Sequence, residues 1–373
     1  MKIALVHDYL TQYGGGERVL QALCELFPDA PIYTLLYNEE ATGKVFQGRT
    51  IHTSFLQKIP FSRRYHRLFP LLMPLAIEQF DFSDFDTVIS VSASFAKGII
   101  TKPGTRHINY CLTPTRFLWD DSHRYVAEFH YPWPVKKLLP FALTYLRLWD
   151  KEAALRVDEY VGISKFVQER IKKYYYRDAP VIYPPVVISK YHIAPTPGEY
   201  FLMVGRLVGY KRFDLAISAF GAMDLPLKIV GSGPEMKKLK ALSYKLKARN
   251  IEFLGRVSDY AMPELYANAK ALVFPQEEDF GLVPLEAMAS GRPVIAYRGG
   301  GALETIVEGV TGVFFDQQTE IDLCLAVGKL QAMAVDPERI RRHAMQFDIN
   351  IFNDSIRGIL KGDARKQSLF GAF

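Results

Sequence analysis

Two glutamates, Glu278 and Glu286, have the spacing in this chain that points most clearly to chemistry. They lie in residues 274–291, which read FPQEEDFGLVPLEAMASG. A short apolar run before Glu278 predicts a strand. The segment 282–291 predicts a helix that tolerates a proline in its first turn and ends at a left-handed glycine cap. Glu278 is therefore expected in a loop and Glu286 on the helix that follows it.

The start of this helix is suited to bind an anion. The backbone N–H groups of Gly281, Leu282 and Val283 are expected at the positive end of the helix dipole, where phosphate binds well. A phosphate would repel the two carboxylates nearby, so both are better suited to accept hydrogen bonds from sugar hydroxyls. The stretch therefore predicts a nucleotide-sugar site. The alternative is an ordinary acidic loop before an amphipathic helix.

Two cations form a second candidate group. Arg206 and Lys211 lie five positions apart in a loop between a predicted strand at residues 200–204 and a helix from about residue 214. Paired cations in one loop can converge on a diphosphate. The alternative is a pair of solvated surface cations.

Three adjacent glycines, Gly14, Gly15 and Gly16, separate a predicted strand at residues 2–6 from a predicted helix at residues 18–27. They lack the G-x-G-x-x-G spacing of a dinucleotide site. Glycines before a helix nevertheless let a ligand approach the backbone closely. A plain turn is the alternative.

Together these residues resemble the E-x7-E signature of the GT-B retaining glycosyltransferases of family 4, and in particular the bacterial O-antigen mannosyltransferase branch. The resemblance rests on Glu278 and Glu286 with Phe280-Gly281 between them, on the Glu-Ala-Met-Ala-Ser-Gly that follows, and on the other landmarks in chain order. It covers essentially the whole chain. It implies an α/β fold of GT-B type, with two Rossmann-like doubly wound domains facing a cleft.

The resemblance also implies roles for single residues. The expected catalytic residues are Glu278, Arg206 and Lys211. The carboxylate of Glu278 would bind the donor sugar, and the two cations would stabilise the negative charge of the diphosphate. Glu286 is expected on the ribose. The residues expected to bind the nucleotide sugar are Gly15, Gly16, Arg206, Lys211, Val257, Glu278, Phe280, Gly281, Leu282, Val283 and Glu286.

The acceptor is expected beside the loop that follows a predicted strand at residues 107–111, with Thr113, Arg116 and Asp120 on the acceptor side. Similar transferases usually carry a histidine at the position of Leu112. Either the reaction does not need that group, or another group replaces it, or this chain has altered activity. The resemblance suggests front-face attack in which the departing phosphate accepts the proton, and such a reaction tolerates Leu112.

The expected function is retaining transfer of a hexose, with mannose from GDP-mannose favoured, to a saccharide or lipid-linked acceptor in cell-surface polysaccharide synthesis. No metal and no cofactor is expected. One alternative is a catalytically weak nucleotide-sugar-binding partner of a polysaccharide assembly complex. Another is a different GT-B enzyme, such as an epimerase or a phosphorylase, although no base for C2 and no pyridoxal-bearing lysine is visible.

Strands alternate with helices along the chain, which predicts parallel sheets. Prolines and a glycine in the polar run at residues 190–199 predict a linker. The expected domains are therefore residues 1–190, on the acceptor side, and residues 191–354, which bind the nucleotide sugar. The family resemblance implies that a helix at about residues 355–373 returns to the first domain.

The composition of the 373 residues, with 49% hydrophobic and 23% charged residues, is that of a soluble globular protein. The start of the chain does not resemble a signal peptide, and no apolar run reaches 18 residues, so a cytoplasmic location is expected. Three widely spaced cysteines argue against a structural zinc. The pattern Asp84-Phe85-Asp86 precedes a predicted strand, so a solvated turn is favoured over a metal motif.

Two basic and aromatic segments, residues 58–67 and 131–147, predict contact with an anionic membrane surface, which would place the protein at the inner face of the cytoplasmic membrane. The alternative is a pair of core-packing amphipathic helices. The lysines at residues 237–249 are expected to form a solvated helix face and not a nucleic-acid surface.

Overall fold

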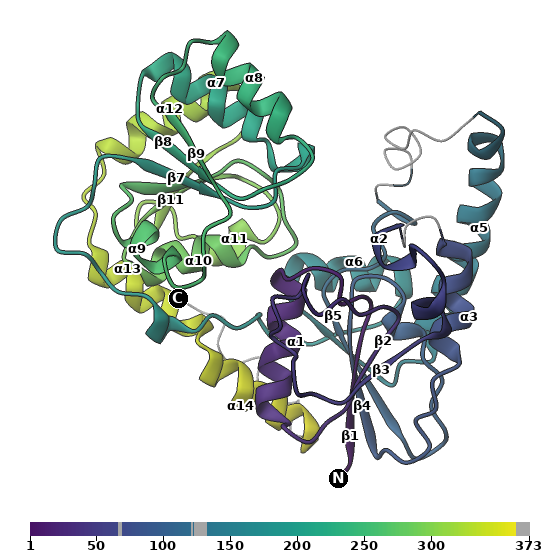
Figure 1. Cartoon of the computed structure of the whole chain (residues 1–373). Coiled ribbons are helices and arrows are strands. Elements are labelled where there is room, and N and C mark those ends of the chain that lie inside the picture. Colours follow the sequence, from purple (N-terminus) through teal and green to yellow (C-terminus); the bar gives the residue numbers. More distant parts are fainter. Residues whose placement is uncertain (66–68, 121, 123–132, 363–373) are drawn as a thin grey trace. The chain divides into compact units, whose positions relative to one another are not determined.

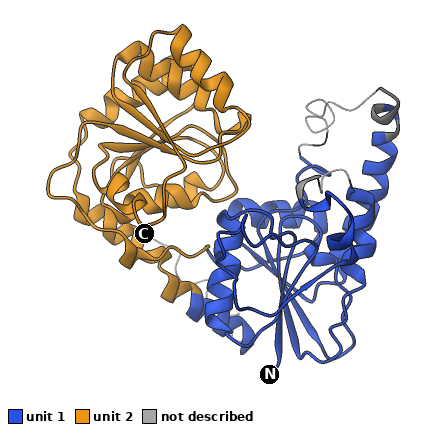
Figure 2. Ribbon diagram, viewed as in Figure 1, with its two compact units in different colours: residues 1–183, 353–373 blue, residues 184–352 orange. Residues whose placement is uncertain are grey.

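The structure is a computed structural model that describes residues 1–65, 69–120, 122 and 133–362 (Figure 1). The chain forms two compact units, Met1–Tyr183 with Asn353–Phe373, and Pro184–Phe352 (Figure 2). Each unit has a six-stranded sheet whose paired strands all run parallel. The predicted doubly wound α/β class is confirmed.

The sheet of the first unit has the strand order β3-β2-β1-β4-β5-β6, the order of a Rossmann-like sheet. Its strands are β1 Ile3–His7, β2 Ile32–Thr34, β3 Ile51–Thr53, β4 Thr87–Ser92, β5 Arg106–Cys111 and β6 Glu159–Gly162. Its helices are α1 Gly15–Leu26, η1 Phe55–Lys58, α2 Ser62–Tyr65, η3 Pro70–Leu72, α3 Met73–Glu78, η4 Ala96–Gly98, α5 Trp133–Leu155 and α6 Lys165–Tyr175.

The sheet of the second unit has the order β12-β11-β10-β7-β8-β9, which is the same winding. Its strands are β7 Phe201–Val204, β8 Leu227–Val230, β9 Ile251–Gly255, β10 Ala271–Phe274, β11 Val294–Tyr297 and β12 Gly312–Phe315. Its helices are η5 Ile188–Lys190, η6 Gly209–Lys211, α7 Phe213–Met223, α8 Met236–Lys245, α9 Met262–Ala267, α10 Leu282–Ala289, α11 Ala302–Thr305, α12 Glu320–Gln331, α13 Pro337–Ala344 and η7 Met345–Phe347. The last helix, α14 Ile349–Leu360, passes from the second unit into the first.

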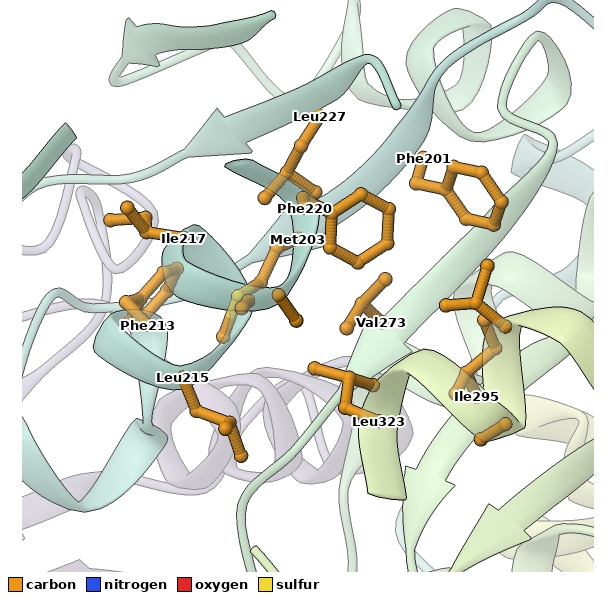
Figure 3. Packing of buried hydrophobic residues seen from close by; sticks show 14 of the residues in the cluster. Phe201, Met203, Phe213, Leu215, Ile217, Phe220, Leu227, Val273, Ile295 and Leu323 are labelled. Atoms are coloured by element: carbon orange, nitrogen blue, oxygen red, sulfur yellow. The ribbon is translucent and has the colours of Figure 1, made fainter. Parts of the chain in front are cut away.

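The core of the second unit lies between one face of its sheet and helices α7 and α12 (Figure 3). Phe201 of β7 packs edge to face against Phe220 of α7, with ring centroids 5.0 Å apart. Leu323 of α12 belongs to the same fully buried cluster. Strands that are buried on both faces read as continuous apolar runs, which is why β10 was visible in the sequence.

The boundary between the units falls at Tyr183, before the proline-rich run. The residues that follow belong to the second unit because they pair with the chain that leads into α14. The N–H of Val186 donates to the carbonyl of Phe347, and the N–H of Ile349 donates to the carbonyl of Val186, both at 3.0 Å. At its far end α14 belongs to the first unit, where the Arg106 guanidinium donates to the carbonyl of Ile359 at 3.0 Å.

The helix expected at residues 18–27 begins instead at Gly15. The carboxylate of Glu17 accepts a hydrogen bond from the N–H of Gly14 at 2.9 Å, and an acidic group in the first turn also suits the helix dipole. Gly15 and Gly16 therefore belong to the first turn of α1, and do not form a separate loop.

The pattern of residues 337–360 predicts a continuous helix, but the structure interrupts it between α13 and α14. The buried ring of Phe347 packs against Phe280 with centroids 6.0 Å apart. Asp348 is extended, which allows its neighbours to bond with Val186. The basic helix expected at residues 235–249 also ends early, at Lys245, and the lysines on its outer face are exposed as expected.

Strand β3 and helix α9 are among the elements that were not expected from the sequence. Strand β3 has only three residues, and none of them is fully buried. Helix α9 has six residues, of which the first two are Met262 and Pro263. Neither is long enough to show a periodic pattern. Among the helices of the described ranges, none has both the length and the apolar content that crossing a membrane requires.

Candidate functional site

In the second unit, the loops that follow β7 and β8 approach each other so closely that only glycine fits. Gly231 has φ +134°, and a Cβ built on it would lie 1.9 Å from the carbonyl oxygen of Gly205. Gly205 itself has φ +154° and donates its N–H to Val230 at 3.0 Å. The two loops therefore form one layer of backbone at the carboxyl edge of the sheet, where ligands of such sheets bind.

Lys211 lies at the end of the loop after β7, in η6, and contacts Glu278 directly. Its Nζ is 2.6 Å from Oε1 of Glu278, and the two side chains are 12% and 20% exposed. Burial on its own lowers the pKa of Lys211, but the negative charge and hydrogen bond of Glu278 outweigh that effect, so the pKa is raised. Lys211 is therefore a protonated cation held against a carboxylate.

The loop that carries Glu278 is fixed by its neighbours. Gln276, which is buried, donates from Nε2 to Oε1 of Glu278 at 3.3 Å. The N–H of Gly301 donates to the carbonyl of Glu278 at 2.9 Å. Gly300 has φ +57°, and a Cβ on it would lie 2.3 Å from the same carbonyl oxygen. The glycine run after β11 thus lies directly against the backbone of Glu278.

Glu286 is held differently, inside the unit. It lies on α10 and is almost completely buried. Its Oε2 accepts a hydrogen bond from the hydroxyl of Tyr266 at 2.6 Å. Tyr266 belongs to α9, a helix that was not expected from the sequence. The sequence shows a tyrosine 20 residues before Glu286, but only the fold shows that the two side chains meet.

The start of α10 combines a glycine and a proline. Gly281, at φ +91°, precedes the helix, and Leu282 and Val283 form its partly exposed first turn. Pro284 has no N–H, so the backbone donors of this helix end are the residues before it. Phe280 is buried against Phe347 and therefore belongs to the core.

Arg206 and Val257 occupy other loops of the same edge. Arg206 is exposed at the start of the loop after β7, and Val257 is partly exposed after β9. The structure thus brings Lys211 and Glu278 into contact. It places Arg206, Val257 and the start of α10 on loops at the carboxyl ends of the same sheet.

In the first unit, the predicted residues Gly15 and Gly16 lie beside a buried pair that the sequence analysis did not identify. His7 ends β1, and its Nε2 is 3.6 Å from Oε1 of Glu17 in α1. Burial lowers the pKa of His7, but the hydrogen bond and charge of Glu17 and the charge of Asp8 outweigh that effect and raise it. The imidazole therefore has an acidic partner that favours its charged form.

Leu112 lies close to this pair. A Cβ built on Gly16 would be 2.7 Å from Cδ1 of Leu112 and 3.5 Å from Cε1 of His7. An imidazole is thus present near Leu112, although it comes from a different strand. The adjacent Asp8 accepts hydrogen bonds from the N–H groups of Ala93 and Ala96 at 2.7 and 2.6 Å.

Two of the expected acceptor-side residues are held by α6. Arg170, which is buried, donates from Nη1 to Oγ1 of Thr113 at 2.8 Å and forms an ion pair with Asp120. Asp120 also accepts a hydrogen bond from the hydroxyl of Tyr174. Arg116, the third expected acceptor-side residue, lies between Thr113 and Asp120 in sequence and is partly buried. The segment 113–120, here called the 113–120 loop, is therefore an ordered part of the unit.

His107 lies on the strand that the sequence predicts at residues 107–111, and Asp84 lies in the predicted turn. His107 is fully buried in β5, where its Nε2 lies 2.7 Å from Oγ of Ser90. Burial and the charge of Arg156 lower the pKa of His107 to about 3, so it stays neutral. Asp84 lies before β4, as expected of a turn. Within the described ranges, no cluster of three or more His, Cys, Asp or Glu side chains could hold a metal ion.

The fold defines the class of protein. The crystal structure of HepE of Anabaena, in complex with UDP and glucose, aligns with 97% of this chain and 99% of its own at a TM-score of 0.73 and 19% identity. At this identity the likeness shows the fold alone. The chain has the GT-B fold, built of two Rossmann-like units, and the expected fold class is confirmed.

Sequence similarity adds a second, narrower finding. Residues 188–346 match the family model described as Glycosyl transferases group 1. The chain is 32% identical over 180 residues to an uncharacterized glycosyltransferase of Methanocaldococcus jannaschii, over 48% of this chain and 50% of that one. It is 30% identical over 247 residues to the GDP-mannose-dependent alpha-(1-6)-phosphatidylinositol monomannoside mannosyltransferase of Mycolicibacterium smegmatis, over 58% and 63% of the two chains. The chain thus spans about half to just under two thirds of the length of these relatives.

The contact between Gly300 and Glu278 generates a test of the site's geometry. Gly300→Ala should lower the free energy of unfolding by at least about 1 kcal/mol more than Gly309→Ala, because the new Cβ collides with the carbonyl of Glu278. Gly309 is the matched control: its φ is +75°, so alanine is strained there too, but no atom lies within 4 Å of its Cβ position. Denaturant unfolding of the two variants measures the difference. Equal losses would mean that the Glu278 loop moves away freely.

Proposed function

We propose that this chain is a metal-independent retaining glycosyltransferase that moves a hexose from a nucleotide diphosphate sugar to a saccharide or lipid-linked saccharide in cell-surface polysaccharide synthesis. The observation that supports it most is the ion pair between Lys211 and Glu278 at the carboxyl edge of the second sheet. The match of residues 188–346 to the glycosyl transferases group 1 model covers the same edge.

The proposed donor site assigns the diphosphate to cations. Lys211 is protonated and Arg206 is always charged, so both can stabilise the negative charge that develops on the leaving group. Backbone N–H groups at Leu282 and Val283 add donors without adding a mobile charge. With these groups present, charge stabilisation does not require a divalent ion.

Glu278 would bind hydroxyls of the donor sugar. Lys211 and Glu278 compensate each other's charge in their ion pair. A diphosphate carries more negative charge than one carboxylate, so it would draw the ammonium toward itself and leave Glu278 able to accept hydrogen bonds from the sugar. Glu286, whose Oε2 accepts a hydrogen bond from Tyr266, would accept from the ribose.

The acceptor is assigned to the first unit. Gly15 and Gly16 would allow close approach to the backbone, and Thr113, Arg116 and Asp120 belong to the ordered 113–120 loop. In front-face attack the departing phosphate accepts the proton, so the reaction does not require a basic side chain at the position of Leu112. Gly16 lies beside both Leu112 and the imidazole of His7. Because the pKa of His7 is raised, this imidazole can supply positive charge near Leu112.

GDP-mannose is the favoured donor, because the relative from Mycolicibacterium smegmatis is named as GDP-mannose-dependent. The structure of HepE was solved with UDP and glucose, so UDP-sugars need to be tested alongside it. The test offers GDP-mannose, UDP-glucose, UDP-galactose and dTDP-rhamnose, each with octyl glycosides of mannose, glucose, galactose and N-acetylglucosamine. We expect nucleoside diphosphate release that depends on the acceptor and is unchanged by EDTA.

The second candidate is a nucleotide-sugar-binding partner without transferase activity, which Leu112 favours. Both candidates predict that a nucleoside diphosphate raises the melting temperature, because a ligand bound only to the native state stabilises it. Only the transferase predicts acceptor-dependent release. Binding without release over the whole panel would therefore favour the partner. Strong inhibition by EDTA would contradict the metal-independent mechanism alone.

Lys211 offers a sharper test of the donor site. Lys211→Ala should lower turnover by at least about 100-fold, because it removes a cation from the developing charge of the diphosphate. Lys228→Ala is the control: Lys228 of β8 also pairs with a glutamate, Glu252, at 3.7 Å, but outside the loops of the site. Turnover is measured with the best donor and acceptor of the panel. A loss below about threefold in Lys211→Ala would place the diphosphate elsewhere.

We also propose that the first unit contacts an anionic membrane surface. Phe141, Tyr145, Leu148 and Leu155 form an exposed apolar stripe on α5, and Phe141 is 75% exposed. Lys137 on α5 and Arg63 in the other predicted segment are both exposed, which supports attraction to anionic lipid. Other parts of the predicted segments, including Arg67 and Tyr131, lie outside the described residues.

Vesicle sedimentation tests this surface. The double change Phe141→Ser and Tyr145→Ser should remove most binding to vesicles of equal parts phosphatidylglycerol and phosphatidylcholine, because two large apolar side chains no longer leave water. The control is Ile321→Ser with Leu325→Ser, which removes two exposed apolar residues at the same spacing from α12 of the second unit. Replacing Arg63, Arg64 and Arg67 by Ser should weaken binding mainly at low salt. Equal binding of both double variants would refute the α5 surface.

A further inference from the structure

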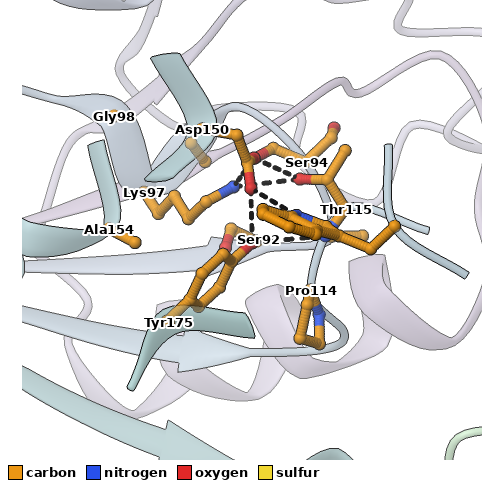
Figure 4. Close-up of polar contacts among 12 residues, drawn as sticks. Ser92, Ser94, Lys97, Gly98, Pro114, Thr115, Asp150, Ala154 and Tyr175 are labelled. Atoms are coloured by element: carbon orange, nitrogen blue, oxygen red, sulfur yellow. Dashed lines mark hydrogen bonds and ion pairs between the residues drawn. The ribbon is translucent and has the colours of Figure 1, made fainter. Parts of the chain in front are cut away.

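A buried carboxylate in the first unit, Asp150, is the centre of a hydrogen-bond network that none of the roles above uses. It lies on α5 and is 0% exposed. Figure 4 shows side chains from η4, the 113–120 loop and α6 converging on it. A charge that is fully removed from water needs partners for all its acceptor positions, so each contact matters for the energy of the site.

Each oxygen of Asp150 accepts two hydrogen bonds. Oδ1 accepts from Nζ of Lys97 at 2.5 Å and from the hydroxyl of Thr115 at 2.6 Å. Oδ2 accepts from Nε1 of Trp119 and from the hydroxyl of Tyr175, both at 2.9 Å. The four donors come from three separate segments of the chain.

Lys97 balances the charge. It is as deeply buried as Asp150, and its ammonium also contacts Oγ1 of Thr115 at 3.0 Å and the carbonyl of Ser94. An ion pair in the interior is retained at little cost only when both members are fully bonded. This pair meets that requirement, so the carboxylate is an acceptor held in a fixed position.

Two of the donors to Asp150, Thr115 and Trp119, belong to the 113–120 loop. Tyr175 adds a third link to the loop, because its hydroxyl oxygen accepts from the N–H of Thr115 at 3.3 Å. The burial of Tyr175, and next the charge of Asp150, raise its pKa well above the ordinary value, so it remains a neutral donor.

Two side chains lie against the ring of Trp119. Tyr174 stacks on its ring with centroids 5.0 Å apart, and the Arg147 guanidinium lies 5.9 Å from the ring centroid. Arg147 also donates to the carbonyl of Leu118 at 2.8 Å. Trp119 is therefore positioned to hold the loop and is less suited to stack against a sugar.

The same network reaches the first loop of the unit. Asp8, which follows His7 at the end of β1, accepts from the backbone N–H groups of Ser94 and Ala96, the residues just before Lys97. Hydrogen bonds thus run from the edge of β1 through η4 to Asp150 and on to the 113–120 loop. The end of β1 and the 113–120 loop therefore share one buried polar framework.

We infer that Asp150 is a positioning residue for the acceptor: it holds the 113–120 loop in its binding conformation through Thr115, Trp119 and Tyr175. The inference rests on the proposed transferase function. Because the loop is fixed before the acceptor arrives, its ordering entropy is not lost on binding. Loosening the network should therefore raise KM for the acceptor and leave binding of the nucleotide unchanged.

The test compares two buried tyrosines. Tyr175→Phe removes the hydroxyl that links Asp150 to the N–H of Thr115. Tyr110→Phe is the matched control, because Tyr110 is equally buried and its hydroxyl donates to the carbonyl of Ile182 at 2.8 Å, away from Asp150. Each variant is assayed with the donor and octyl glycoside that give the wild type its highest turnover. Melting temperatures are measured with and without the matching nucleoside diphosphate.

We expect KM for the acceptor to rise roughly 5- to 10-fold in Tyr175→Phe and by less than about twofold in Tyr110→Phe, as the loss of one net hydrogen bond implies. The increase in melting temperature that the nucleoside diphosphate produces should be the same in both. Thr115→Val, which removes the hydroxyl bonded to Oδ1 and keeps the shape, should raise KM in the same direction. This second variant carries the test if Tyr175→Phe does not fold.

An unchanged KM in both Tyr175→Phe and Thr115→Val would overturn the positioning role while leaving the transferase function intact. So would an equal rise in Tyr110→Phe, since that would reflect general loss of stability. A wild-type chain that releases no nucleoside diphosphate with any donor and acceptor would overturn the transferase function itself, and the positioning role with it.

Discussion

Both sheets of this protein are entirely parallel, and that constraint decides where chemistry can occur. A parallel strand can be joined to the next only by a crossover, so every strand of a sheet ends at the same edge and each ends in a loop there. In the second unit this edge gathers Lys211, which follows β7, and Glu278, which follows β10, into one ion pair. The two residues are far apart in the chain and meet because β7 and β10 are neighbours in the sheet.

Three of the charged sites in the described part of the chain differ in how their charge is compensated and in how accessible they are. Lys211 and Glu278 neutralise each other at an edge that is still partly accessible, so an arriving anion can exchange partners with them. Asp8 accepts hydrogen bonds from backbone N–H groups, including those of Ala93 and Ala96. Asp150 has a buried cation and three neutral donors and no access to water. The solvent accessibility of a charged side chain therefore distinguishes one that can bind a ligand from one that holds a loop in place.

Much of the fold could be predicted because its strands are short apolar runs between glycine-marked turns. The pattern predicts strands at residues 227–230 and 271–274 and a helix at residues 165–175, and β8, β10 and α6 have these bounds. Ser164 precedes this helix as a predicted N-cap, and its hydroxyl accepts from the N–H of Val167 at 3.0 Å. The misses have local causes. β3 and α9 are too short to show a period. The tail is interrupted at Phe347 because that ring packs against Phe280, a contact between residues distant in the chain.

The sequence by itself determined the chemical inventory of the site: two glutamates at a fixed spacing, two cations in one loop and glycines where loops begin. These features are local, so residue type and spacing are enough to find them. Only the tertiary structure decided which groups meet. It paired Lys211 with Glu278, Tyr266 with Glu286, and His7 with Glu17 beside Leu112. It also showed Asp150, a single aspartate in an amphipathic helix, to be the centre of a buried network. The physical reason is that a hydrogen bond or ion pair depends on distance in space, which the order of strands in the sheet sets and the order of residues in the chain does not.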